Sequence, residues 1–167
     1  VDMISWAEAT GRLATLLRAL VARYPKQPRL FTLLEQLGID TDPTTTDFDP
    51  ETAIAVYTET ARQARVNDNP AGELEAMIRL GFTYLEREEG QEEENITRAL
   101  EHFHAGQALI EEAANPQLSS LLFSGMGNTF QRQKKIDEAV KAHEQALRIR
   151  QRNGDRAGQL NSLTALG

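Results

Sequence analysis

The 167-residue sequence contains no cysteine, so disulfide bonds, thiolate zinc sites and cysteine nucleophiles are excluded. Aromatic residues make up only 6% of the chain and there are six prolines, a composition that favours an all-helical protein over a β-sandwich. No apolar run approaches the roughly 20 residues of a membrane span. The opening stretch VDMISWAEATGR lacks the basic and apolar segments of a signal peptide. We therefore expect a helical protein of the cytoplasm.

Basic residues are scarce over most of the chain, whose formal net charge is −7. Residues 1–130 carry 10 Lys and Arg against 21 Asp and Glu, whereas residues 131–167 carry 8 against 4. The acidic part argues against a general affinity for nucleic acid, because phosphate neutralisation needs clustered basic side chains. The basic end leaves two interpretations open: an acidic partner or a head-to-tail contact on one side, and ordinary solvated helix faces on the other.

Candidate catalytic and metal-binding side chains do not combine into a site. His102 and His104 are two residues apart on a predicted helix, so they face different directions and do not share a metal ion. The acidic stretch EEGQEEEN (88–95) lacks the alternating ligands and central glycine of an EF-hand loop. No Ser or Thr has a partner for a nucleophilic triad, and no carboxylate pair is tied to an apolar pocket. We expect no enzymatic activity, no metal and no cofactor.

Three segments share one pattern: a small residue, three positions, a large ring, two positions and another small residue. On a helix this spacing places all three residues on one stripe, where the small residues allow close approach and the ring fills the gap. The matching residues are Ala53, Tyr57 and Thr60; Ala99, Phe103 and Gly106; and Ala139, His143 and Ala146.

A second kind of helix alternates with the first and carries an apolar–Gly–x–x–aromatic pattern. Gly81, Gly127 and Gly167 mark its three copies and are 46 and then 40 residues apart, which gives a period of about 40 residues with two helices per unit. Gly127 in FSGMGNTFQRQKK (123–135) is therefore a helix-packing residue, and the stretch is not a phosphate loop, which requires a preceding strand. Gly125 lies outside the pattern, and both a close approach and a bend remain open there.

These two alternating helices resemble the tetratricopeptide repeat, in its variant with a longer period. The resemblance covers about residues 50–167 and implies a right-handed solenoid of helix-turn-helix repeats: a helix over 51–66, repeats over 70–115 and 116–156, and a half-repeat over 157–167. The pattern departs from the family at His143, where an aromatic residue is usual. The packing residues that the resemblance implies are Gly81, Tyr84, Ala99, Phe103, Gly127, Phe130, Ala139, His143, Ala146 and Gly167.

Residues 1–39 do not fit the repeat and predict a helical pair, followed by a linker over 40–49 that is rich in Pro, Thr and Asp. The stretch WAEATGRLATLLRALVARYPKQPRL (6–30) resembles the closing part of bacterial effector-associated domains, small death-domain-like adaptors that recruit effectors through homotypic contacts. A helical cap on the solenoid is the alternative. The adaptor interpretation, the missing initiator Met and the stop within a repeat all predict a piece of a larger bacterial signalling or conflict-system protein.

The resemblance implies a protein-interaction scaffold whose partner lies in a concave groove lined by the first helix of each repeat. Asn128 follows the packing glycine, where related repeats place an amide that binds a ligand's backbone, and Phe82 occupies the equivalent place one repeat earlier as an apolar anchor. Self-assembly through the apolar side of the half-repeat at 154–167 is the alternative function. The predicted groove residues are Glu75, Ile78, Phe82, Leu85, Glu86, Leu121, Ser124, Asn128, Gln131, Arg132, Asn161 and Thr164.

Overall fold

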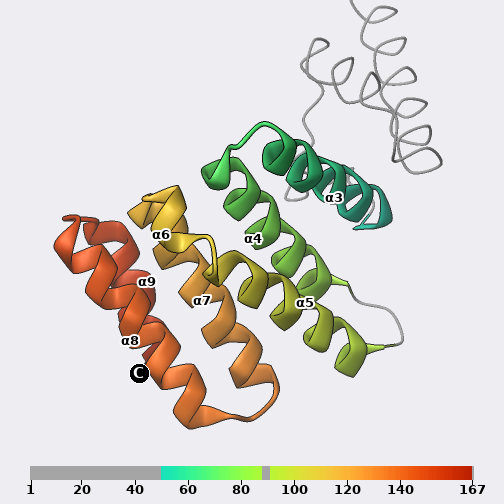
Figure 1. Ribbon diagram of the computed structural model, residues 1–167. Helices are drawn as coiled ribbons and strands as arrows, with labels where there is room; N and C mark the ends of the chain where they lie inside the picture. The colour runs from blue at the N-terminus through green and yellow to red at the C-terminus, as the bar shows by residue number, and fades with distance from the viewer. Residues whose placement is uncertain (1–49, 88–90, 167) are drawn as a thin grey trace, which may run out of the picture. The chain divides into compact units, whose positions relative to one another are not determined.

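The computed structural model describes residues 50–87 and 91–166, and all regular elements within these ranges are α-helices (Figure 1). The all-helical prediction is therefore confirmed for this part of the chain, while the predicted helical pair (1–39) and linker (40–49) lie outside it. The helices are α3 (Pro50–Val66), α4 (Pro70–Glu86), α5 (Glu92–Gln107), α6 (Ile110–Ala113), α7 (Pro116–Arg132), α8 (Ile136–Arg152) and α9 (Arg156–Leu166).

The chain divides into two compact units, Val1–Glu59 and Thr60–Gly167. In the first unit, the described residues are the beginning of α3, where Ala53, Val56 and Tyr57 are buried on one stripe of the helix. The second unit holds the end of α3 and all of α4 to α9, and it contains every candidate site residue considered below.

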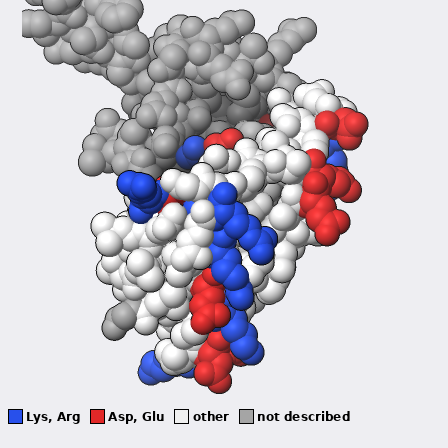
Figure 2. Space-filling view, turned by 90° about the vertical axis from the view of Figure 1, so that its left-hand side faces the viewer, with Lys and Arg blue, Asp and Glu red and all other residues white. Residues whose placement is uncertain are grey.

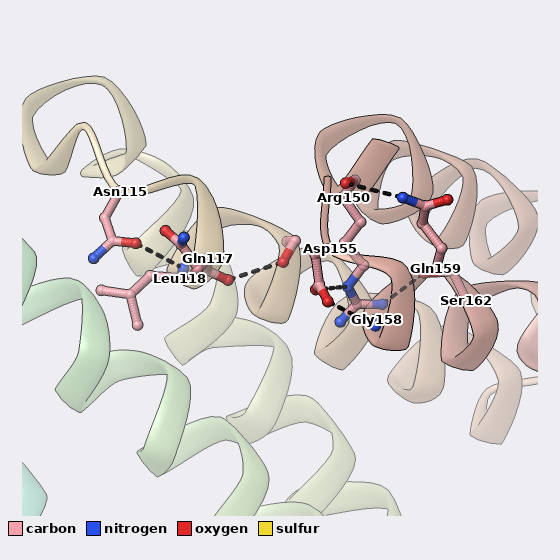
Figure 3. A network of polar contacts seen from close by, with 9 residues as sticks. Asn115, Gln117, Leu118, Arg150, Asp155, Gly158, Gln159 and Ser162 are labelled. Atoms are coloured by element: carbon pink, nitrogen blue, oxygen red, sulfur yellow. Dashed lines mark hydrogen bonds and ion pairs between the residues drawn. The ribbon is translucent and has the colours of Figure 1, made fainter. Parts of the chain in front are cut away.

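One kind of corner precedes α4, α7 and α9. A residue with positive φ ends the preceding turn, and the next residue places a side-chain oxygen on the backbone N–H three positions later, at 2.9 to 3.2 Å, which caps the new helix. Figure 3 shows two of these caps, from Asn115 to Leu118 and from Asp155 to Gly158. The corners are Asp68–Asn69, Ala114–Asn115 and Gly154–Asp155. Their spacing of 46 and 40 residues is the spacing of the glycines in the sequence.

The ring of Phe103 on α5 is wedged between α4 and α7, and it is fully buried. A Cβ atom built on Gly81 of α4 would lie 2.5 Å from its Cε1 and Cζ atoms, and one built on Gly125 of α7 would lie 2.5 Å from its Cζ atom. Gly125 therefore allows α7 to approach the Phe103 ring closely, which is one of the two interpretations that the sequence left open at this position. The two helices of the pair α4–α5 are antiparallel, as are those of the pair α7–α8, and α7 contacts both α4 and α5 (Figure 1).

His143 takes the place of the aromatic ring between α7 and α8. It is 2% exposed, and a Cβ atom on Gly127 would lie 2.5 Å from its Cε1 atom. Ala139 and Ala146, on the same stripe of α8, are also buried. An imidazole therefore fills the volume that a Phe or Tyr ring fills elsewhere in the pattern. Among the other predicted packing residues, Tyr84 is buried and stacks on His102, with ring centroids 5.4 Å apart, whereas Gly167 lies outside the described ranges.

Arg150 is buried and forms hydrogen bonds that join α8 to α9 (Figure 3). Its Nη1 group donates to the hydroxyl oxygen of Ser162 at 2.5 Å, and its carbonyl oxygen accepts from the side-chain amide of Gln159 at 3.3 Å. The carboxylate of Asp155 lies 3.9 Å from its Nε atom. The sequence patterns gave no indication of this cluster, because its members occupy positions that differ from one repeat to the next.

Candidate partner-binding surface

The C-terminal ends of α4, α7 and α9 are joined through the last turn of α7. The Nη1 group of Arg132 donates to the carbonyl oxygen of Leu85 on α4 at 2.6 Å, and the side-chain amide of Gln131 donates to the carbonyl oxygen of Ala165 on α9 at 3.2 Å. Both acceptors are terminal carbonyls that have no partner within their own helix. These bonds link the last turn of α7 to the end of α4 and to the end of α9.

Exposed side chains recur at equivalent positions on these three helices, spaced by 46 and 40 residues. Glu75, Leu121 and Asn161 form the first row, and all three are exposed. In the second row Phe82 is half-buried and Asn128 is exposed. We call the side of α4, α7 and α9 that carries these five residues the A face.

Two residues that the sequence predicted for partner contact are core residues. Ile78 is fully buried and Leu85 is 6% exposed, so the prediction that they contact a partner is wrong. The reason is that α4 packs against both α5 and α7, which gives it an apolar face wider than that of a helix with one neighbour. The hydroxyl of Ser124 is also enclosed, and it has no hydrogen-bond partner among the described residues.

Several other predicted residues are engaged within the chain. Besides Arg132 and Gln131, whose bonds are given above, the hydroxyl of Thr164 donates to the carbonyl oxygen of Leu160 at 3.0 Å. The Phe82 ring makes an edge-on contact with Phe103, at a centroid distance of 5.4 Å.

Two further members are acidic side chains. Glu75 forms an exposed ion pair with Arg79 at 3.0 Å, and Glu86 is exposed at the end of α4.

The A-face side chains that remain available are two amides and one leucine. Asn128 and Asn161 are exposed, and neither side-chain amide makes a hydrogen bond to a described residue. Leu121, which precedes both in the chain, is 40% exposed. An amide donates to a carbonyl and accepts from an N–H at once, so this set suits the backbone of an extended peptide.

Charged side chains of both signs lie on the face of the second unit that Figure 2 shows. In Figure 2 the Lys and Arg side chains form a band down the visible face, with carboxylates beside its lower half and a separate acidic group at the right-hand edge.

The buried carboxylate of Glu73 is satisfied by Arg65, whose Nη2 group lies 2.5 Å from it, and this bond raises the pKa of Arg65. Burial lowers the pKa of both His102 and His143.

An open depression of about 570 Å³ lies away from the A face, between α6, the beginning of α7 and the end of α8. None of its lining residues is among the predicted groove residues. Its apolar members, Ile110, Phe123 and Ile149, come from three different helices, so no local sequence pattern brings them together. We call this depression the α6–α8 pocket.

Two features are absent from the described ranges. No group of three or more His, Asp or Glu side chains there is placed to hold a metal ion. No helix among the same residues is long and apolar enough to cross a membrane.

No protein-family model matches the sequence, and no curated protein matches it. The tetratricopeptide resemblance therefore rests on the sequence patterns of this chain.

Proposed function

We propose that the chain is a non-catalytic protein-interaction scaffold of the tetratricopeptide type, which binds a peptide or protein partner on the A face. It acts in the cytoplasm within a larger bacterial signalling or conflict-system protein. The observation that carries the proposal is the first row of the A face, where Glu75, Leu121 and Asn161 are exposed at equivalent positions of three helices whose ends are linked by hydrogen bonds.

The solenoid arrangement in this proposal is supported by the recurrence of local structure. The corners before α4, α7 and α9 repeat with spacings of 46 and 40 residues, and a ring meets a glycine in both helix pairs, Phe103 with Gly81 and His143 with Gly127. Helix pairs that repeat with constant geometry stack into a superhelix, and such superhelices present their first helices on one side.

The chemistry of the A face supports an extended peptide as the partner. Asn128 and Asn161 supply amides for peptide N–H and C=O groups, and Leu121 supplies an apolar contact. Two of the predicted groove residues are unsuitable for a binding test. Phe82 and Arg132 contribute to packing and to the end of α4, so their replacement would confuse lost binding with lost stability.

The test compares two double variants of equal chemistry in pull-downs from bacterial lysate, followed by calorimetry with the purified partner. The variant Leu121→Ser with Asn128→Ala alters the A face. The matched control, Ile136→Ser with Gln151→Ala, alters exposed positions of α8. We expect the A-face variant to bind its partner at least tenfold more weakly, as for central interface residues, and the control to bind like the parent. Retention by both variants, or loss in the control alone, contradicts the proposal.

A second candidate function, self-assembly, is favoured by the outer side of α9, where Leu160 is 66% and Leu163 is 54% exposed. Leu160 is equivalent by the 46- and 40-residue spacing to Leu74 and Ser120, both of which are buried. In this function the side of α9 packs on a second copy of the chain. Sedimentation velocity over a range of concentrations tests it: Leu160→Ser with Leu163→Ser abolishes any dimer, and a parent chain that stays monomeric throughout contradicts it.

A further inference from the structure

The α6–α8 pocket has an apolar floor of three half-buried side chains, Ile110, Phe123 and Ile149. Its volume of about 570 Å³ is within the usual range of ligand sites, about 300–1,000 Å³. The pocket is open along one side, and an open depression suits one side chain of a larger partner better than a small molecule, which requires enclosure on most sides.

Side-chain amides surround this floor and are available to a ligand. Gln107, Gln145 and Asn153 line the pocket, and none of their amides makes a hydrogen bond to a described residue. The oxygen of Asn115 caps α7, which leaves its NH₂ group as a further donor. Donors and acceptors around an apolar floor match a peptide backbone with one apolar side chain directed inward.

Arg152 provides an unpaired positive charge at the end of α8. It lines the pocket and is exposed, and no ion pair or hydrogen bond joins its side chain to the described part of the chain. The other two arginines of α8 differ: Arg148 lies 4.0 Å from the carboxylate of Glu144, and Arg150 donates to Ser162. A carboxylate is the group that an available guanidinium binds best, through two parallel hydrogen bonds.

Glu111 on α6 also lines the pocket. Like charges repel, so a ligand carboxylate is disfavoured beside Glu111 and favoured beside Arg152. α7 begins at the pocket without an acidic residue in its first turn, so the positive end of its dipole also favours a carboxylate there. These charges therefore favour a carboxylate close to Arg152 and away from Glu111.

We propose that the α6–α8 pocket binds an extended segment of a partner protein that places an apolar side chain on Ile110, Phe123 and Ile149 and a nearby carboxylate on Arg152. The site is separate from the A face and does not depend on it. It gives the chain a preference for acidic-apolar sequences that the amides of the A face do not supply.

The test uses short acetylated and amidated Ser/Gly peptides that carry one Leu and, two residues away, one Asp, in both orders. Each peptide is titrated into the isotope-labelled full chain, and the backbone amide shifts are followed by NMR. We expect saturable shifts at Phe123 and Ile149 with at least one order. Replacing the peptide's Asp by Asn, or Arg152→Gln in the protein, weakens binding about tenfold, as for the loss of one charge-assisted hydrogen bond.

The matched control is Arg148→Gln, which removes an exposed arginine of the same helix from outside the pocket. We expect it to leave binding unchanged. Four outcomes overturn the proposal: no saturable shifts at millimolar peptide, equal binding of the Asn peptide, an equal loss in the control, or shifts at Leu121 and Asn128 in place of the pocket. Since those last two residues lie on the A face, the same spectra separate failure of this site from failure of the proposed function.

Discussion

Replacing Gly125 by Ala adds one methyl group at the closest contact between α7 and Phe103. In a helix interior Ala is favoured over Gly by about 1 kcal/mol, so propensity alone predicts a more stable protein. The new Cβ atom would lie 2.5 Å from the ring, however, well inside van der Waals contact. The same ring edge meets Gly81 on the other side, so the ring has little room to withdraw. Overpacking of this kind costs about 1–3 kcal/mol.

The upper end of that range applies because the ring is fully buried and held from both sides. The expected net effect of Gly125→Ala is therefore a loss of about 2 kcal/mol in the free energy of unfolding. For a chain of this size that loss lowers Tm by about 4–8 °C. Urea unfolding followed by circular dichroism measures the first quantity, and a thermal scan measures the second.

A double-mutant cycle with Phe103→Leu separates the clash from other effects of the substitution. In the Leu background the ring edge is gone, so Gly125→Ala should cost much less than in the parent or become stabilising. The predicted clash with the Phe103 ring is refuted if Gly125→Ala raises the free energy of unfolding by about 1 kcal/mol in the parent chain, which is what helix propensity alone provides. It is also refuted if the cost is the same in both backgrounds.

Three further predictions concern a cap, a histidine and an arginine. Asn115→Ala should cost about 1 kcal/mol and speed amide exchange in the first turn of α7; unchanged exchange would show that the cap is dispensable. The pKa of His143 is lowered by burial and by Arg150, so the unfolded chain binds more protons than the folded chain between that lowered pKa and about 6.5. The free energy of unfolding should therefore fall as the pH drops from about 7 through this window, and His143→Gln should flatten the dependence in urea titrations; a slope that His143→Gln leaves unaltered would assign it to other groups. Arg132→Gln removes the hydrogen bond to the Leu85 carbonyl and should cost about 1 kcal/mol in urea unfolding, whereas an equally stable variant would mean that water replaces the bond.

The helices and several of their contacts follow from local patterns in the sequence. The register between repeats aligns Gly81 with Gly127 and Phe103 with His143, and in the structure each glycine meets the ring of its own helix pair. The alignment could be read from the sequence because each pattern is set by residues within one helix. A ring on the second helix can meet a glycine on the first only at one register, whatever packs around the pair.

Features that depend on three or more helices could not be predicted from local sequence patterns in the same way. The burial of Ile78 depends on α4 packing against more than one helix, and an apolar residue at a predicted groove position looks the same in sequence whether it is covered or not. The absence of a side chain at Gly125 makes room for the Phe103 ring, which belongs to the preceding repeat unit. The α6–α8 pocket likewise combines Phe123 and Ile149 with residues of α6, and its shape depends on how helices from different pairs are spaced.

The three corners before α4, α7 and α9 also bear on how the chain tolerates change. The same left-handed backbone is occupied by Asp68, Ala114 and Gly154, with φ values of 52°, 46° and 69°. Only glycine adopts this conformation without strain from its side chain, so the other two corners hold strain that the caps and the surrounding helices outweigh. The substitution Ala114→Gly should therefore stabilise the protein by relieving backbone strain at this corner, whereas any replacement of Gly154 would introduce such strain.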